Sequence, residues 1–132
     1  MEERYSFKAK RKNNGEWVIG ALIIYEDETC KIATSCLDSG ADKAILVCAY
    51  DVDRDTICQC TGLKDKHGKL IWENDIVKIN NSEVNTLIAF RDFEIICIVP
   101  SEKYYKHRLE YDMEYEVVGN IFDNKELLES EG

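Results

Sequence analysis

The sequence predicts a mostly β fold, and three observations lead to this expectation. Apolar and polar residues alternate along several short stretches, as they do in strands that bury one face. Asn, Asp and Gly, the usual turn residues, separate these stretches. The chain of 132 residues is 45% hydrophobic, which is enough for the packed interior of one small domain. We therefore expect a single domain over residues 1–132, with possible sub-lobes over 1–55 and 56–132.

The first sub-lobe should begin with a β-hairpin. Asn13, Asn14 and Gly15 tolerate the positive φ of a tight turn, so Tyr5–Arg11 should pair with Glu16–Tyr25. The second of these strands reads WVIGALIIY, is apolar on both faces and is therefore expected to be central. Further strands are expected over Cys30–Cys36 and Ala44–Tyr50, with a loop over Leu37–Asp42 between them.

A second hairpin is predicted in the middle of the chain, from Thr56–Leu63 and Lys69–Ile71. Asp65 suits the first position of its turn, and Gly68 supplies a positive φ at the last. Asn74 is expected to adopt a positive φ in a tight corner that follows. Three more strands should then follow, over Ile76–Ile79, Asn85–Phe90 and Phe93–Val99.

The C-terminal quarter is predicted to contain a loop, a strand and a short helix. Lys103–Arg108 is basic and is expected to be loop. Glu110–Val118 alternates strictly, which places four carboxylates on one face of a strand. Asn124 is a good N-cap for a short helix that should end near Glu129. The four carboxylates belong to Glu110, Asp112, Glu114 and Glu116.

The formal net charge of −9 argues against binding of nucleic acid over the whole surface, because phosphate affinity depends on Lys and Arg. The acidic excess is concentrated in the second half of the chain. A local basic patch could form only from Lys8, Lys10, Arg11 and Lys12.

The six cysteines are expected to be reduced and structural, with a metal site or a disulfide as the alternatives. Cys58 and Cys60 are the only close pair, and His67 and His107 stand alone, which does not match the spacing of zinc ligands. We therefore expect no cofactor. The apolar runs are far shorter than the roughly 20 residues of a membrane span, and the N-terminus lacks a signal-peptide core, so we expect a soluble, cytoplasmic protein.

Three segments carry a resemblance to a known family. They are FKAKRKNNGEWVIGALI from Phe7, TICQCTGLKDKHGKLIWENDIV from Thr56, and EVVGNIFDNKEL from Glu116. Together they resemble the YopX family of bacteriophage and prophage proteins. Cys58, His67 and Asn74 depart from the family's Gly, Asn and Gly, but Asn74 still tolerates a positive φ.

The resemblance implies a small β-barrel-like fold whose C-terminal part is SH3-like. It also implies a phage or prophage gene product that acts in the bacterial cytoplasm, in a family without an established biochemical role.

No catalytic group can be assigned, because neither His67 nor His107 lies in a motif with a nucleophile. We therefore expect a non-enzymatic protein, although a catalytic site could still be assembled from residues distant in sequence. The turns around the second hairpin are expected to be mainly structural, and the alternative is a recognition surface. That surface would comprise Lys64, Asp65, Glu73 and Asp75.

The carboxylates of Glu110, Asp112, Glu114 and Glu116 are expected to form a solvated strand face rather than a metal site. Neighbouring residues on one strand face are about 6.6 Å apart, whereas a metal needs convergent ligands. The basic side chains of Lys103, Lys106 and Arg108 could pair with this face, and a basic partner surface is the alternative.

Two hypotheses for the function follow. The first is an accessory protein that binds another protein, itself included, through strand edges, the apolar runs Ile19–Tyr25 and Ile95–Val99, and tyrosines near the C-terminus. These tyrosines are Tyr104, Tyr105, Tyr111 and Tyr115. The second is a small nucleic-acid-associated module, because SH3-like barrels often serve in this way and the segment Lys8–Lys12 is basic, although the charge balance weakens this hypothesis.

Overall fold

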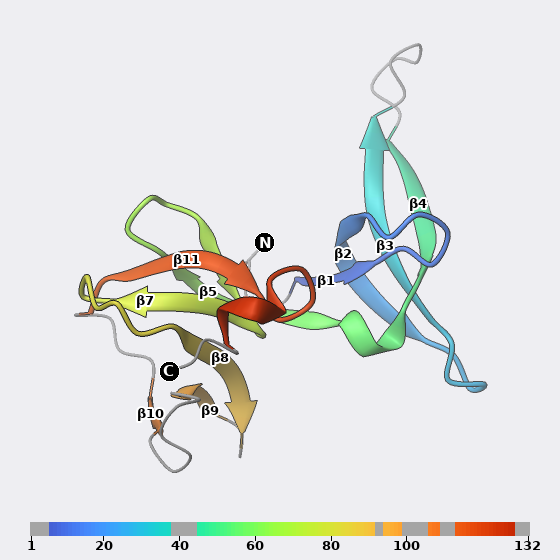
Figure 1. The fold of residues 1–132 in the computed structure, drawn as a ribbon. Coiled ribbons are helices and arrows are strands. Elements are labelled where there is room, and N and C mark those ends of the chain that lie inside the picture. Colours follow the sequence, from blue (N-terminus) through green and yellow to red (C-terminus); the bar gives the residue numbers. More distant parts are fainter. Residues whose placement is uncertain (1–5, 38–44, 92–93, 99–105, 109–112, 129–132) are drawn as a thin grey trace. The chain divides into compact units, whose positions relative to one another are not determined.

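The computed structural model describes residues 6–37, 45–91, 94–98, 106–108 and 113–128. The chain divides into two compact units, Met1–Cys60 and Thr61–Gly132. Both are built from antiparallel strands, as the mostly β prediction requires (Figure 1). No helix within the described residues is long and apolar enough to cross a membrane.

The first unit is a meander of four strands followed by a short 3₁₀ turn and the start of a fifth strand. These elements are β1 (Phe7–Lys10), β2 (Trp17–Ile24), β3 (Cys30–Leu37), β4 (Ile45–Val52), η2 (Arg54–Thr56) and β5 (Cys58–Lys64). The strand order is β4-β3-β2-β1-β5, and β3 and β4 run side by side as a long hairpin (Figure 1). The sub-lobe boundary expected after residue 55 lies within η2, shortly before the division between the units.

The predicted N-terminal hairpin is confirmed. Lys10 lies opposite Trp17, and the backbone N–H of Gly15 donates to the carbonyl of Arg11 at 2.9 Å. Gly15 has a φ of 74°, which an L-residue with a Cβ rarely adopts. The side chain of Asn14 closes the turn by accepting a hydrogen bond from the N–H of Glu16. Turn chemistry in the sequence therefore fixes where β1 ends and β2 begins.

The sheet of the first unit curls until the end of β4 reaches the end of β1. A bridge pairs Arg11 with Val52, and the N–H of Asp53 donates to the carbonyl of Lys10 at 2.8 Å. The curl encloses a small apolar core on one face of the sheet. Its fully buried members are Ala9, Cys30, Ile32 and Val52, with Phe7, Val18, Leu22 and Ile57 packed against them.

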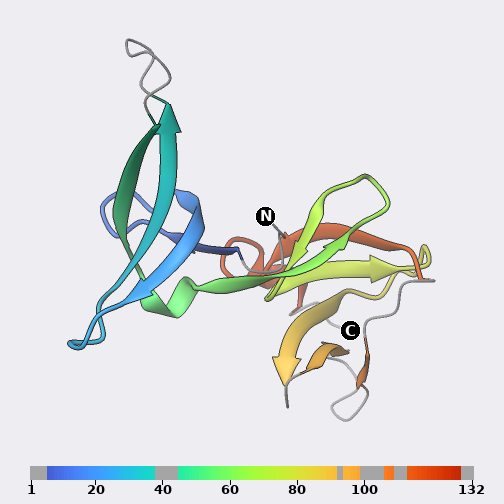
Figure 2. The same ribbon diagram turned by 180° about the vertical axis from the view of Figure 1, so that it is seen from behind.

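The second unit contains the end of β5, six further strands and another 3₁₀ turn. The elements are β6 (Leu70–Trp72), β7 (Asp75–Ile79), β8 (Thr86–Arg91), β9 (Glu94–Ile98), β10 (Lys106–Arg108), β11 (Tyr115–Asn120) and η3 (Lys125–Leu127). Five of them form a sheet in the order β10-β9-β8-β7-β11. Figure 2 shows β7 and β11 side by side, as their pairing requires.

The predicted turns of the second unit are confirmed. The N–H of Gly68 donates to the carbonyl of Asp65 at 2.9 Å, and Gly68 has a φ of 83°. Asn74 has a φ of 73°, so the corner before β7 forms without the glycine of the family pattern. The strands pack around a buried cluster of Ile71, Val77, Ile88, Cys97 and Tyr115.

Two expectations about the second unit need correction. Lys106–Arg108, expected as loop, forms β10 by pairing with β9, since His107 lies opposite Cys97. The expected C-terminal helix is a single 3₁₀ turn over Lys125–Leu127, without a side-chain cap from Asn124. Instead, the Asn124 side chain accepts a hydrogen bond from the N–H of Asn120 at 3.2 Å, so it connects the turn to β11.

In the first unit, the expected loop over Leu37–Asp42 lies mostly outside the described residues.

An SH3-like barrel is not seen among the described strands, because the five-stranded sheet ends in two different edge strands, β10 and β11. The two long apolar runs do not supply edges either. Ile19–Tyr25 lies largely in β2, between β1 and β3, and Ile95–Val99 lies largely in β9, between β8 and β10. The prediction that the second strand is central is thus confirmed, and both apolar runs lie largely in strands that have a neighbour on each side.

The cysteines are partly as expected. Cys30, Cys58, Cys60 and Cys97 are free and buried, where a thiol packs as a small hydrophobe. Cys48 in β4 is disulfide-bonded, and its partner lies outside the residues whose side chains are described. The expectation of six reduced cysteines is therefore wrong at Cys48.

Candidate functional site

Asp65, at the turn between β5 and β6, is the best-connected residue of the predicted recognition surface. Its Oδ1 accepts hydrogen bonds from the N–H groups of His67 and Lys69, both at 2.9 Å. Its Oδ2 accepts from the N–H of Val117 in β11 at 3.0 Å. Only 7% of the residue is exposed, so the carboxylate serves the backbone rather than a ligand.

The hydrogen bonds to Asp65 also determine its ionisation. Burial by itself would raise the pKa of this carboxyl group. The N–H groups of Val117, Lys69 and His67 stabilise the charged form and together outweigh burial, so the pKa lies below its ordinary value of 3.8. Asp65 is thus held as a carboxylate that joins the hairpin to β11.

The corner formed by Glu73, Asn74 and Asp75 is similarly engaged. Asp75 is 3% exposed, and its Oδ2 accepts from the N–H of Trp72 at 2.8 Å. The backbone of Asn74 reaches two other parts of the unit, since its N–H donates to Ile88 and its carbonyl accepts from Ile121. Glu73 is half-buried. This corner therefore holds strands together.

An exposed cluster lies where the β5–β6 turn meets β11. Glu116 Oε1 lies 3.8 Å from Lys66 Nζ, and Glu116 Oε2 lies 3.7 Å from His67 Nε2. Lys66 Nζ also donates to Asn81 Oδ1 at 3.2 Å. The exposed ion pair of Lys66 with Glu116 contributes little to stability, and it leaves both charges accessible to a partner.

The remaining predicted site residues are only partly visible. Lys64 and Glu114 are exposed, whereas Glu110 and Asp112 lie outside the described residues. The N–H of Glu114 donates to Asn80 Oδ1 at 2.9 Å, which fixes the approach to β11. The structure thus brings Asp65 and Glu116 together but shows no convergence of Glu114 with them. A recognition role for the exposed residues of this group stays a prediction.

Sequence reasoning missed an apolar surface on the first unit, which we call the outer face. In β2, Ile19 is 51% exposed, and Ala21 and Ile23 are exposed on the same side of the strand. The outer face comprises Ile19, Ala21 and Ile23 of β2, Ala33 of β3, and Val47 and Ala49 of β4. The run WVIGALII does not reveal this surface, because apolar residues occupy the positions of both strand faces.

The register explains why small side chains cross the middle of the outer face. Ala21 lies directly opposite Ala33, and Ala33 lies opposite Ala49, so a row of alanines crosses three neighbouring strands. Directly opposite residues point to the same face of a sheet. Larger apolar side chains flank this row, and Val47 is 75% exposed. Exposed apolar side chains gathered on one face are typical of an interaction site.

Basic and aromatic side chains border the outer face at β1. The ammonium groups of Lys8 and Lys10 lie 4.7 Å and 5.4 Å from the ring centroid of Trp17. On the opposite face of the sheet, where Tyr50 lies opposite the buried Ile32, the Arg11 guanidinium lies 4.2 Å from the ring centroid of Tyr50. Cation–π contacts of this geometry order the basic segment predicted from the sequence.

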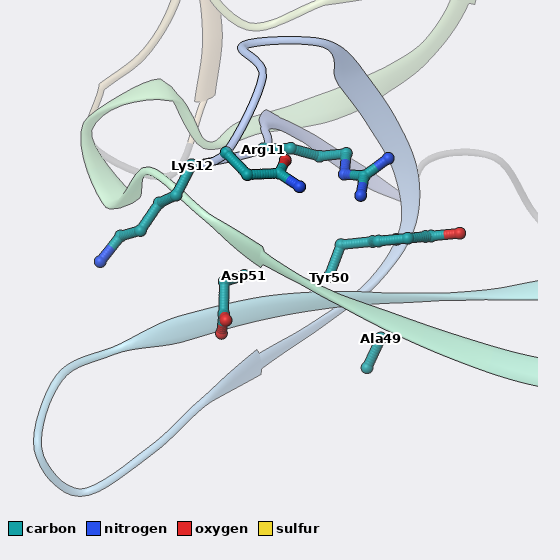
Figure 3. A pocket seen from close by; sticks show the side chains of 6 residues that line it. Arg11, Lys12, Ala49, Tyr50 and Asp51 are labelled. Carbon is teal, nitrogen blue, oxygen red and sulfur yellow. The ribbon is translucent and has the colours of Figure 1, made fainter.

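A pocket opens beside the last of these contacts. Its volume is about 360 Å³, and Figure 3 shows its lining side chains, which come from the turn after β1 and from the end of β4. The lining residues are Arg11, Lys12, Asn13, Ala49, Tyr50 and Asp51. Asp51 is paired with Lys31 at 3.0 Å, so the cations Arg11 and Lys12 dominate the charge of the pocket.

Comparisons with known proteins place the chain in a family. A search of curated proteins found no match. The family model described as "YopX protein" matches residues 6–129, which is nearly the whole chain. The match includes both units and all the strands described above. The chain therefore belongs to the YopX family.

Proposed function

We propose that this protein is a non-enzymatic phage or prophage accessory protein that acts in the bacterial cytoplasm and associates with a second copy of itself through the outer face. The exposure of the outer face is the observation that supports this. Ile19 and Val47 are 51% and 75% exposed, and no described residue of the first unit covers them.

The register favours pairing of like faces. The alanine row formed by Ala21, Ala33 and Ala49 leaves a shallow central strip, with Ile19 and Ile23 to either side in β2. Two copies related by a two-fold axis could place the isoleucines of one copy on the strip of the other. Most soluble homo-oligomers have such closed symmetry, because one patch then serves both partners.

Charge at the border would influence this association without driving it. Lys31 and Asp51 form an ion pair at 3.0 Å beside Ile23. Ile23 lies opposite Lys31, and Lys31 lies opposite Asp51, so these three residues form the row next to the alanine row. A polar rim around an apolar centre is usual for protein interfaces. An interface centred on the alanine row should therefore persist at high salt, because salt screens charges rather than apolar contacts.

Light scattering after size exclusion tests the proposal at micromolar protein and at both low and high salt. The wild type should be a dimer in both buffers. Ile19→Glu should give a monomer, because it places a charge beside the alanine row, within the apolar contact. Val84→Glu is the matched control, since Val84 is 46% exposed in the second unit, and it should remain a dimer. A monomeric wild type, or a dimer that survives Ile19→Glu, would contradict the proposal.

A second candidate function is a nucleic-acid-associated module. The basic and aromatic contacts of Lys8 and Lys10 with Trp17, and of Arg11 with Tyr50, favour it, since single strands bind to basic grooves with aromatic platforms. The net charge of −9 opposes it. The cations also occupy aromatic faces on which bases would have to stack.

A further inference from the structure

Among the residues that the structure describes, the edge of β4 is paired at one end and has no strand beside it further along. At the paired end, the N–H of Lys12 donates to the carbonyl of Asp51 at 3.0 Å, and Arg11 forms a bridge with Val52. The chain then turns away at Asn13 and reaches Gly15, whose positive φ sends it back into β2. The pairing of β1 with β4 therefore stops at Asp51.

The register shows which backbone groups of β4 remain at this edge. Asp51 lies opposite Lys31 in β3, yet its carbonyl accepts from Lys12 on the other side. Lys31 and Asp51 are thus a non-hydrogen-bonded pair of the β3–β4 ladder. Such pairs alternate with hydrogen-bonded ones in an antiparallel ladder. Ala49 and Val47, two and four residues before Asp51, therefore also direct their N–H and C=O groups away from β3, towards the open edge.

The cationic pocket lies where the turn leaves this edge. Ala49 and Asp51 supply one wall from β4, while Arg11 and Lys12 supply the other from the end of β1 (Figure 3). Within the described residues, neither Arg11 nor Lys12 forms an ion pair, and Arg11 is held in place by Tyr50. Asp51 points away from Arg11, and its charge is engaged by Lys31.

We propose that the open edge of β4 binds an extended peptide as an additional strand, and that a carboxylate of this peptide enters the pocket beside Arg11 and Lys12. The guest strand would continue the line of β1 past the point where Asn13 turns away. Its backbone would pair with Ala49 and Val47, which supplies affinity that does not depend on sequence. The carboxylate contact would supply selectivity, because hydrogen bonds between charged groups are stronger than neutral ones.

A peptide suits this site better than a nucleic acid. Paired N–H and C=O groups in register match another peptide backbone, whereas a phosphate chain offers only acceptors. Asp51 in the pocket wall would repel a row of phosphates but tolerates a single carboxylate on the side of Arg11. The proposal does not rest on the outer-face dimer, because the edge uses backbone groups rather than the side chains of Ile19 and Ile23.

The test uses the full chain and a displayed library of random linear peptides. Selection on the wild-type protein should enrich sequences with β-branched residues at alternate positions and one Asp or Glu near an end. Ala49→Pro removes an N–H that points to the open edge and leaves the β3 ladder intact, since proline is tolerated on edge strands. This variant should capture none of the enriched peptides.

A synthetic copy of the most enriched peptide then tests the carboxylate. Replacing its acidic residue with Gln, or Lys12 with Glu in the protein, should each weaken binding about tenfold or more. Lys64→Glu is the charge-matched control in the second unit, and Ile19→Glu is the control for the outer face. Both controls should bind as the wild type does. In an NMR titration, the largest amide shifts should fall on Val47, Ala49 and Lys12.

Several outcomes would overturn the proposal. The first is a selection on the wild-type protein that enriches no peptide. The others are equal capture of the enriched peptides by Ala49→Pro and the wild type, and equal binding of the Gln analogue and the acidic peptide. If Ala49→Pro does not fold, the proposal is still tested by Lys12→Glu and by the NMR titration. Unchanged binding by Lys12→Glu, or amide shifts that avoid Val47 and Ala49, would then refute it. Binding of labelled oligothymidine that is lost in Lys12→Glu, with no enriched peptide, would assign the site to nucleic acid instead. An edge already paired with the β4 of a second copy, seen as slow amide exchange at Ala49 without peptide, would also refute it.

Discussion

The carboxylate of Asp65 accepts a hydrogen bond at 3.0 Å from the backbone N–H of Val117, a residue 52 positions further along the chain. The same residue closes its own turn through the N–H groups of His67 and Lys69. One side chain therefore fixes the β5–β6 turn and docks it on β11. Backbone pairing supports the same junction, since the N–H of Lys66 donates to the carbonyl of Tyr115 at 2.8 Å.

Asp65→Asn should destabilise the protein by about 2–3 kcal/mol, because one of the two polar atoms becomes a donor and leaves an N–H group without an acceptor. The folded-state pKa of Asp65 is lowered, so its carboxylate stabilises the fold above the ordinary value of 3.8. This stabilisation decreases as the pH falls below 3.8, and it is lost once the pH has passed the lower pKa of Asp65 in the folded state.

Urea denaturation at a series of pH values measures this effect. The difference in unfolding free energy between wild type and Asp65→Asn should be constant near neutral pH and should shrink as the pH falls below 3.8. Asp55→Asn is the matched control, because Asp55 is exposed, and it should change stability by less than about 0.5 kcal/mol. An Asp65→Asn variant as stable as the wild type at neutral pH would refute the structural role.

Gly68→Val should cost about 1–2 kcal/mol, because a β-branched residue resists the φ of 83° at this turn. A Cβ at Gly68 would meet no atom within 4 Å, so the cost comes from the backbone alone. Gly68→Asn is the control, since Asn tolerates this conformation, and it should be nearly neutral. Thermal melting of both variants measures the effect, and equal melting temperatures for Val and Asn would contradict the turn assignment.

Gly20→Ala tests a different requirement for glycine, namely the close approach of β2 and β3. A Cβ at Gly20 would collide with the backbone carbonyl of Ala33, so a strand must shift. We expect a cost of about 3 kcal/mol, the upper end of what overpacking usually costs. Ala21→Val, on the exposed side of the same strand, should be tolerated. If Gly20→Ala melts with the wild type, the β2–β3 spacing described here is wrong.

The turns could be predicted from the sequence because their requirements are local. Gly15, Gly68 and Asn74 each adopt the positive φ that their residue types suggested. By contrast, the partner of Asp65 could not be predicted, because Val117 is contributed by a strand 52 residues away. The strand β10 was missed for the same reason, since its polar residues Lys106–Arg108 show no strand pattern and are held by pairing with β9.

In the candidate sites, too, local features could be predicted from the sequence, whereas features that depend on distant residues could not. Acidic residues such as Asp65 and Asp75 were visible in the sequence, but their burial depends on how the strands assemble. The pocket was not predictable, because the curl of the sheet brings Arg11 to Tyr50 across 39 positions of sequence. Apolar residues in WVIGALII predicted a strand correctly, yet only the register could show that Ile19 is exposed.

Thiol reactivity should distinguish the buried cysteines from the oxidised one. In denaturant without reductant, we expect the four free thiols of Cys30, Cys58, Cys60 and Cys97, because Cys48 is disulfide-bonded. In the native protein these four should react slowly. Burial raises the pKa of Cys97 to about 12, and the thiolate is the reactive form. Six thiols in denaturant, or rapid native alkylation of Cys97, would contradict this picture.

Nucleic-acid binding should be weak and strongly dependent on salt. With a net charge of −9, attraction to phosphates can come only from the segment Lys8–Lys12, where Lys8 and Lys10 already contact Trp17. Fluorescence anisotropy with labelled oligothymidine should show binding only at low salt, and the logarithm of the affinity should fall linearly with the logarithm of salt concentration.

Variants test whether the basic segment causes this salt dependence. Each neutralised phosphate contributes a slope of about −0.7 for single strands, so loss of two lysines should reduce the magnitude of the slope by about 1.4. The double variant Lys10→Gln with Lys12→Gln should show this reduction, whereas Lys64→Gln with Lys69→Gln should bind as the wild type does. Tight binding at high salt, or equal effects of the two double variants, would show that the basic segment does not determine the interaction.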